Sequence, residues 1–148
     1  MDEPRYLGWR QACADAGVRS DPFVATDTTQ AGGLDAGRRV AALSDKPTAV
    51  FVASDRTAVG VLRAFHEQAL RVPDDVAVAS FDGSWEGQYT WPSLTTVRQP
   101  IQAMASAAVD RLLNWRGETP HHETFSGDLV VRESCGPHDS SVHSTNQK

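Results

Sequence analysis

Cysteine is scarce in this chain of 148 residues, which has only Cys13 and Cys135, far apart in the sequence. Two cysteines do not make the disulfide framework of a small secreted protein, so we expect free thiols in a reducing compartment. Long apolar runs are also lacking. None approaches the ~20 residues that a membrane-spanning helix needs, and the N-terminal residues do not resemble a signal peptide. We therefore expect a cytoplasmic protein without a membrane partner.

Clusters of basic residues are missing as well. The chain has 14 Lys and Arg against 19 Asp and Glu, a net charge of −5, and apart from Arg38-Arg39 the basic residues stand singly. Binding to a phosphate backbone requires clustered Lys and Arg that displace counterions. We therefore expect no direct contact with nucleic acid from this chain.

What is present is an alternation of helical and strand-like segments. Apolar residues recur with helical spacing in four stretches, and two short runs are continuously apolar, which is typical of strands buried on both faces of a parallel sheet. The predicted helices span residues 6–16, 30–43, 55–69 and 101–115, and the predicted strands 23–25, 48–53, 76–81 and 94–99. This order favours an α/β fold with a parallel sheet and helices on both faces. Residues 137–148 are predicted to be a disordered tail.

Two aspartates stand where buried strands end. Asp55 follows the run AVFVAS and Asp82 follows AVASF. Ligands of open parallel sheets bind beyond the carboxyl ends of the strands, so we expect both carboxylates to project into one crevice. A carboxylate accepts several hydrogen bonds and suits the hydroxyls of a sugar. The alternative is that each Asp only caps the helix or turn that follows it, with Asp55 as the N-cap of a clear helix.

An arginine and three large aromatic residues are further candidates. Arg5, in the first turn of the first helix, could donate to two hydroxyl oxygens, or it could be an ordinary surface residue. Trp85, Tyr89 and Trp91 lie in a polar loop, an unusual density of large aromatic side chains. They could cover a sugar ring or be buried in a partner subunit.

Several segments together resemble the effector domain of the LacI/GalR family of transcription regulators. They are RYLGW, PTAVFVASDRTAVGVLRA, RVPDDVAVASFDG, PSLTTVRQP and the terminal DLVVRES, in this order, so that the resemblance covers about residues 4–135. The fold that it implies is the periplasmic-binding-protein-like one (type I), in which two α/β subdomains close on a small ligand. Residues 1–136 would be the C-terminal, effector-binding subdomain.

The resemblance also implies roles for individual residues. Ligand contacts would come from Arg5, Ser54, Asp55 and Asp82, with Thr28 and Gln99 at the periphery and Trp85 as a further candidate. A homodimer interface would include Val59, Leu62 and Arg63, with Tyr89 and Trp91. The partner would be a small, carbohydrate-like effector, without a cofactor or metal, and its binding would shift the DNA affinity of a head domain by population shift.

The chain departs from the family pattern at three positions. Ser54 stands where Asn is frequent, and Thr28 where an aromatic residue is often found. Ala69 stands where the family prefers Gly at a helix end, and a left-handed backbone there would cost about 1 kcal/mol.

The resemblance also predicts an incomplete fold. The family's DNA-binding head, N-terminal subdomain and first strand of the second subdomain do not precede Arg5, which suggests either a fragment or a relative that no longer regulates. The helix over residues 100–116 would pack on the other subdomain in the family. We expect its apolar stripe either to fold back on the sheet or to mediate self-association.

Other functions have weaker support in the sequence. An Asp-based, Mg-dependent phosphotransfer site needs a Lys at a strand end, and the chain has only Lys46 and Lys148. His121-His122 has no Cys or acidic partners at metal-ligand spacing, and Ser54-Asp55 has no nearby His for a catalytic triad. We therefore expect no catalytic residues. A self-association module without ligand binding remains an alternative.

Overall fold

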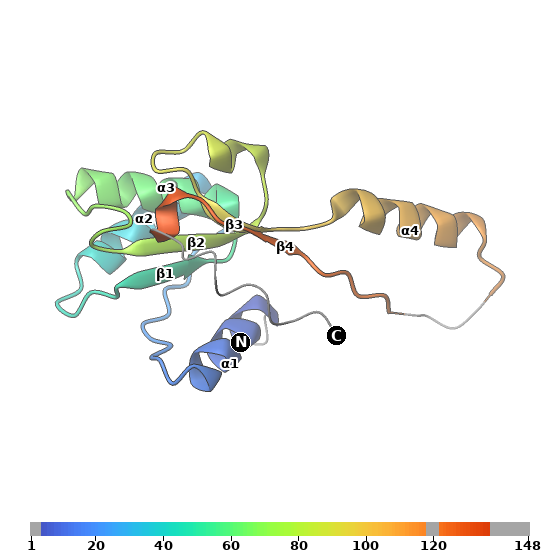
Figure 1. Ribbon diagram of the computed structural model, residues 1–148, viewed down its shortest axis with the longest axis horizontal. Helices are drawn as coiled ribbons and strands as arrows, with labels where there is room; N and C mark the ends of the chain where they lie inside the picture. Colours follow the sequence, from blue (N-terminus) through green and yellow to red (C-terminus); the bar gives the residue numbers. More distant parts are fainter. Residues whose placement is uncertain (1–3, 118–121, 137–148) are drawn as a thin grey trace.

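The structure, a computed structural model, describes residues 4–117 and 122–136 (Figure 1). The predicted tail and His121 lie outside the described residues. The elements are α1 (Pro4–Asp15), α2 (Gln30–Ala41), β1 (Ala49–Val52), α3 (Asp55–Glu67), β2 (Ala77–Asp82), η1 (Trp85–Gln88), β3 (Thr95–Arg98), α4 (Ile101–Leu113), β4 (Asp128–Val130) and η2 (Glu133–Cys135).

The four strands form one open sheet in the order β1-β2-β3-β4. β1, β2 and β3 are parallel, and β4 is antiparallel to β3. The predicted α/β fold with a mostly parallel sheet is thus confirmed. The register pairs Val52 with Ser80 and Asp82 with Arg98, so the carboxyl ends of the parallel strands meet at one edge.

Two strand predictions were wrong in part. The run over residues 48–53 was expected to be buried on both faces, but Ala49 and Phe51 are exposed. The reason is that side chains of a strand alternate between the two faces of the sheet: Val50 and Val52 pack against the core, whereas Ala49 and Phe51 project from the opposite face, where they are exposed. Residues 23–25 form no strand in the described structure, because the sheet ends at β1 and offers this segment no ladder. Its Ala25 carbonyl instead accepts a hydrogen bond from Arg39 at 2.8 Å.

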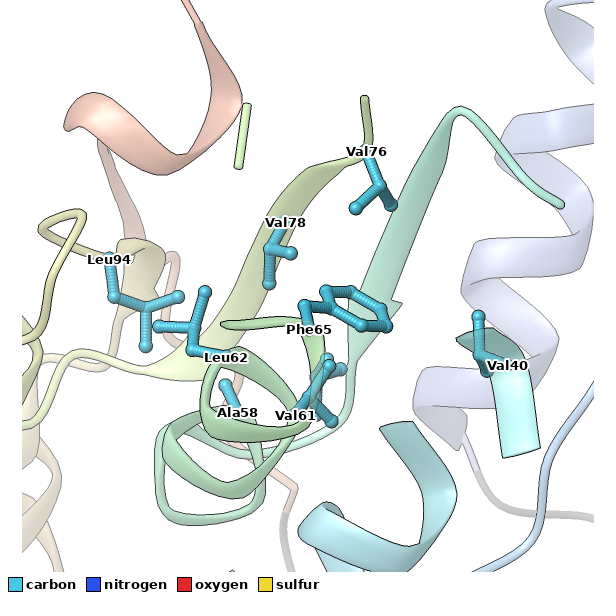
Figure 2. Packing of buried hydrophobic residues seen from close by; sticks show 9 residues of the cluster. Val40, Ala58, Val61, Leu62, Phe65, Val76, Val78 and Leu94 are labelled. Carbon is cyan, nitrogen blue, oxygen red and sulfur yellow. The ribbon is translucent and has the colours of Figure 1, made fainter. Parts of the chain in front are cut away.

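The hydrophobic core lies between α3 and the sheet (Figure 2). Phe65 is fully buried at its centre, among side chains that include Val61, Val78 and Leu94. α2 packs closely along α3 because glycines stand at the contact: a Cβ at Gly37 would come within 2.6 Å of the Ala64 side chain. This packing sets α3 firmly against the strands and places its N-terminus at the carboxyl edge of the sheet.

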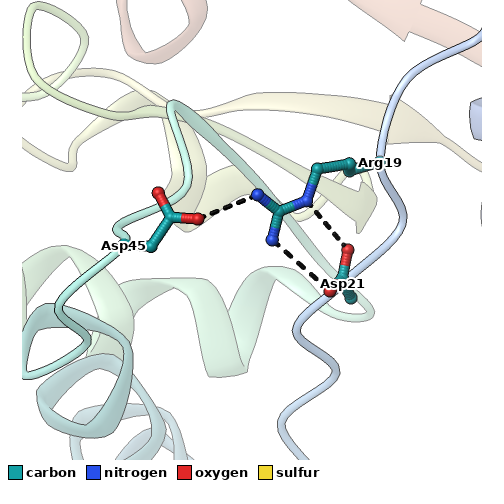
Figure 3. A network of polar contacts seen from close by, with 3 residues as sticks. All are labelled: Arg19, Asp21 and Asp45. Carbon is teal, nitrogen blue, oxygen red and sulfur yellow. Dashed lines mark hydrogen bonds and ion pairs between the residues drawn. The ribbon is translucent and has the colours of Figure 1, made fainter.

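A surface ion-pair network connects the coil after α1 to the loop before β1. Arg19 donates to Asp45 at 2.8 Å and to Asp21 at 3.2 Å (Figure 3). The Arg19 guanidinium lowers the pKa of the Asp21 carboxyl. All three side chains are well exposed, so the network contributes little to stability.

The chain leaves α3 through a left-handed residue at the position where the family prefers Gly. Ala69 has a φ of 55°, a conformation that costs a residue with a Cβ about 1 kcal/mol relative to glycine. Ala69→Gly is therefore expected to raise the free energy of unfolding by up to ~1 kcal/mol. Urea denaturation followed by circular dichroism measures the change. Ala42→Gly is the matched control, because Ala42 ends α2 at a φ of −82° and a glycine there has no strain to relieve. A gain of equal size in both variants would contradict the explanation.

α4 extends away from the sheet on the arm that β3 and β4 form (Figure 1). All residues of α4 are exposed except Ala107, which is half-buried, and 78% of the Leu112 surface is exposed. The expectation that this helix folds back onto the sheet was therefore wrong, and its self-association stays a prediction. α4 leaves the sheet because β3 ends at Arg98 and the helix begins after Pro100, which points the chain outward. Of the helices within the described residues, none has both the length and the apolar character to span a membrane.

Candidate functional site

The carboxyl edge of the parallel strands brings together three polar side chains and one backbone carbonyl. Asp82 is the last residue of β2, and Gln99 directly follows β3. Arg5 reaches the same edge from α1, where it donates to the Ala53 carbonyl after β1 at 2.8 Å. Asp82 lies at the end of its strand, where the sequence placed it, and its contact with a ligand stays a prediction.

Asp82 is half-buried, and its carboxylate lies at the centre of this group. Its Oδ1 accepts a hydrogen bond from Gln99 Nε2 at 3.0 Å. Burial raises the pKa of Asp82, and the Asp55 carboxylate adds to the rise. The Asp55 backbone N–H, the Arg5 charge and the Gln99 side chain act in the opposite direction. The result is an acid flanked by an amide and a guanidinium, a set of donors and acceptors that matches neighbouring hydroxyl groups.

Asp55 does not face the crevice, which corrects the prediction that both carboxylates project into it. Only 1% of Asp55 is exposed. Its Oδ1 accepts hydrogen bonds from the Ser80 hydroxyl at 2.5 Å and the Thr96 hydroxyl at 2.6 Å, and its Oδ2 accepts one from the Ser84 N–H at 2.6 Å. A carboxylate that is buried and hydrogen-bonded in this way holds loops together rather than a ligand.

Ser54 is the N-cap of α3 and takes the place that the alternative hypothesis gave to Asp55. Its side chain accepts the N–H of Thr57 at 3.2 Å and donates to the Thr57 hydroxyl at 2.9 Å. Ser54 is 7% exposed, and both of its side-chain hydrogen bonds are made to Thr57 in the first turn of α3. The prediction that Ser54 contacts the ligand was therefore wrong.

The remaining predicted contacts lie at the surface around the edge. Thr28 is exposed in the coil before α2. Trp85 begins η1, three residues after Asp82, with 68% of its surface exposed. Its ring meets that of Tyr89 edge to face, at 5.7 Å between centroids. Trp85 is thus the first of the three large aromatic residues in the loop that follows Asp82.

The predicted interface residues divide into two groups. Leu62 is 6% exposed and belongs to the hydrophobic core, so its assignment to an interface was wrong. The helical pattern alone could not tell the inner from the outer face of α3 at this position. Val59 is half-buried, and Arg63 is exposed and pairs with Glu67 at 2.7 Å. Tyr89 and Trp91 are 73% and 88% exposed.

The sequence analysis missed the hydroxyl residues that bond to Asp55. Ser80 is buried inside the mostly apolar strand β2, Thr96 is buried inside the short strand β3, and Ser84 follows the glycine after Asp82. A buried hydroxyl in an apolar strand needs a hydrogen-bond partner, and this signal could have identified Ser80, whereas the polar sequence of β3 gives no such signal for Thr96.

A hollow borders the group on the side of the outgoing α4. It has a volume of about 240 Å³, and Phe81, Gln99, Pro100, Met104 and Phe125 are among its lining residues. Gln99 lines this hollow and also donates a hydrogen bond to the Asp82 carboxylate. The polar group therefore adjoins a hollow of mixed lining, which also includes Glu123 and Thr124.

Comparisons with known proteins identify the family to which this fold belongs. The family of periplasmic binding protein-like domains matches residues 1–135. The HTH-type transcriptional repressor PurR of Erwinia tasmaniensis is 35% identical over 142 residues, which are 90% of this chain and 41% of the repressor. The chain thus spans about two fifths of that relative's length.

Two solved structures are similar over most of the chain. A putative LacI-family transcriptional regulator from Sanguibacter keddieii has a TM-score of 0.83 and 37% identity, covering 90% of this chain and 52% of its own. A LacI-family transcriptional regulator from Lactobacillus casei, solved with bound sucrose, has a TM-score of 0.73 and 29% identity, covering 86% of this chain and 49% of its own.

Proposed function

The chain belongs to the periplasmic binding protein-like family of LacI-type transcription regulators, and from this premise we propose that it is an effector-binding domain that holds a small sugar-like molecule through Arg5, Asp82 and Gln99. Residues 1–136 form this domain. The effector is bound and released unchanged, so the domain is a sensor and not an enzyme, and it carries no cofactor.

The Asp82 carboxylate is the observation that carries the proposal. It is half-buried at the carboxyl edge of the sheet and accepts a hydrogen bond from Gln99, with the positive charge of Arg5 nearby. A carboxylate accepts from two vicinal hydroxyls, while a guanidinium and an amide N–H donate to their oxygens. Trp85 covers the apolar face of the ring, and Thr28 lies at the periphery.

The relatives support a carbohydrate effector and a regulatory role. The similar Lactobacillus casei regulator was solved with sucrose, and the similar Erwinia tasmaniensis repressor is of the helix-turn-helix type. We propose that effector binding to this domain shifts the DNA affinity of a helix-turn-helix part of the whole regulator. Such a regulator acts in the cytoplasm, where the DNA is.

Calorimetric titration of the full 148-residue chain with mono- and disaccharides tests the proposed function. We expect a saturable heat with at least one sugar of the panel and none with an uncharged compound that lacks hydroxyl groups. A panel without any saturable response, measured on a folded chain, would contradict the proposal and favour the self-association module.

A homodimer is the second proposal, and the exposed aromatic loop favours it. Tyr89 and Trp91 present large apolar surfaces to solvent, and Val59 and Arg63 lie on the outward side of α3. Aromatic residues and Arg are enriched in protein interfaces, and Tyr and Trp in particular are frequent energetic centres.

Tyr89→Ser is expected to weaken self-association by at least ~10-fold, because truncation of an interface centre costs more than 1 kcal/mol. Sedimentation velocity over a concentration series measures the association constant. Leu112→Ser is the control, since Leu112 lies on the exposed face of α4 and keeps 78% of its surface. If Leu112→Ser disperses the dimer and Tyr89→Ser does not, the association occurs through α4 instead.

A further inference from the structure

The buried Asp55 carboxylate holds the two residues that follow Asp82. Its Oδ2 accepts the backbone N–H of Ser84 at 2.6 Å. Its Oδ1 accepts the hydroxyl of Thr96 at 2.6 Å, and the oxygen of that hydroxyl accepts the backbone N–H of Gly83 at 3.1 Å. Asp55 thus holds Ser84 directly and Gly83 through Thr96.

These bonds act on a backbone segment with an uncommon conformation. Asp82 has a φ of 133° and Gly83 a φ of 76°. A residue with a Cβ rarely adopts a positive φ, and such a conformation persists only when its surroundings hold it. The space around Gly83 is also closed, because a Cβ there would collide with Arg98. The chain therefore has to be held on the C-terminal side of Asp82 for the Asp82 side chain to keep its direction.

We propose that Asp55 and Thr96 are positioning residues of the proposed ligand site, which hold the Gly83–Ser84 backbone and so aim the Asp82 carboxylate at the crevice. The inference rests on the proposed function for the identity of the ligand, but not for the geometry. Asp55 and Thr96 are 1% and 0% exposed, so neither touches a ligand in the crevice. They act through the backbone between them and Asp82.

Thr96→Val separates this role from a change of charge. Valine has nearly the same shape as threonine but neither donates to Asp55 nor accepts from Gly83. Asp55→Asn would be less informative, because Asp55 and Arg5 are the charged groups that act on Asp82, and removing one of them alters its titration directly. Thr96→Ser keeps the hydroxyl and is the conservative variant that should rescue every effect.

Two measurements test whether Asp55 and Thr96 position Asp82, and neither needs a ligand. NMR titration of the Asp82 carboxyl carbon gives its pKa, which burial raises in the native arrangement. Hydrogen exchange gives the protection of the Gly83 and Ser84 amides relative to the Val78 amide in the middle of β2. In Thr96→Val we expect the pKa of Asp82 to fall toward its ordinary value as the side chain turns to water. We also expect at least a tenfold loss of protection at Gly83 and Ser84 relative to Val78, and both changes should be absent in Thr96→Ser.

Ser84→Pro is the second variant, for the case in which Thr96→Val does not fold. Ser84 has a φ of −63°, which proline adopts, and the proline Cδ takes the place of the N–H that Asp55 accepts at 2.6 Å, so this substitution removes the hydrogen bond and pushes the Asp55 carboxylate away from residue 84. The same fall in the pKa of Asp82 is expected. A folded Thr96→Val or Ser84→Pro chain in which Asp82 titrates as in the unaltered chain would overturn the proposal.

The ligand assay distinguishes this proposal from the proposed function. If a sugar binds the unaltered chain, we expect its affinity to fall at least tenfold in Thr96→Val and to return in Thr96→Ser. Equal affinity in Thr96→Val and the unaltered chain would overturn the positioning role. If no sugar of the panel binds the unaltered chain, the proposed function fails, whereas the pKa of Asp82 and the amide exchange still decide whether Asp55 and Thr96 hold the loop.

Discussion

Asp82→Asn is expected to weaken binding of the responding sugar by about 10- to 100-fold, since a hydrogen bond to a charged group contributes roughly 1.5–3 kcal/mol. Asparagine keeps the shape of the side chain and tolerates the positive φ of 133° at this position, so the fold should remain. What is lost is the charge and one of the two acceptor oxygens. Calorimetric titration of both chains with the same sugar measures the effect.

Asp74→Asn is the matched control for this prediction. Asp74 is an exposed carboxylate that pairs with Arg71 at 3.5 Å, in the loop before β2 and thus at the opposite end of that strand. Its substitution should leave the affinity unchanged. Equal losses in the two variants would show that net charge, and not the Asp82 site, governs binding.

Asp82→Asn also tests how the affinity for the sugar depends on pH. Burial raises the pKa of Asp82 above that of an ordinary Asp carboxyl. Binding that needs the ionised form is therefore complete at neutral pH and declines as the pH falls through this raised pKa, earlier than for an ordinary carboxyl. In Asp82→Asn the affinity should not change over this range. A pH-dependent affinity that persists in Asp82→Asn would assign the titration to another group.

Phe65→Ala is expected to have the largest effect on stability, a loss of ~3–5 kcal/mol in the free energy of unfolding. Phe65 is fully buried and fills the space between α3 and the strands, where its loss leaves a cavity that the surrounding side chains cannot close (Figure 2). Native proteins have margins of only ~5–15 kcal/mol, so this loss removes a large part of the stability and should lower the melting temperature markedly. Thermal and urea unfolding followed by circular dichroism measure the difference.

Phe51→Ala is the control, because it makes the same substitution at a partly exposed position. Phe51 lies on the edge strand β1 with 38% of its surface exposed, so we expect a loss of ~1 kcal/mol or less. If Phe51→Ala lowers the free energy of unfolding as much as Phe65→Ala does, the Phe51 side chain is buried in solution. That result would contradict the description of β1 as an exposed edge.

Much of the fold could be predicted because its signals are local. The apolar runs before Asp55 and Asp82 predicted β1 and β2 and the end of the sheet at which both finish, and helical spacing predicted α3. The position of Asp82 could be predicted for the same reason, because a residue at the end of a parallel strand lies at the carboxyl edge of the sheet.

The parts that could not be predicted depend on residues distant in the sequence. The direction of the Asp55 side chain is set by Ser80 and Thr96, which are 25 and 41 residues away. Whether an apolar run is an interior or an edge strand depends on which neighbours are present, and the run at β1 has the composition of either. Leu62 shows the same limit, because it could face inward or outward until the position of α3 against the sheet was known.

NMR mapping of the sugar-binding surface tests the central claim most directly. Amide shifts of the ¹⁵N-labelled chain are recorded while the responding sugar is added. We predict that the largest shifts fall on Ala53, Asp82, Gly83 and Gln99, around the carboxyl edge of the parallel strands, while the amides of α4 stay in place. Shifts concentrated on α4, with the amides of Asp82 and Gln99 unmoved, would contradict the account.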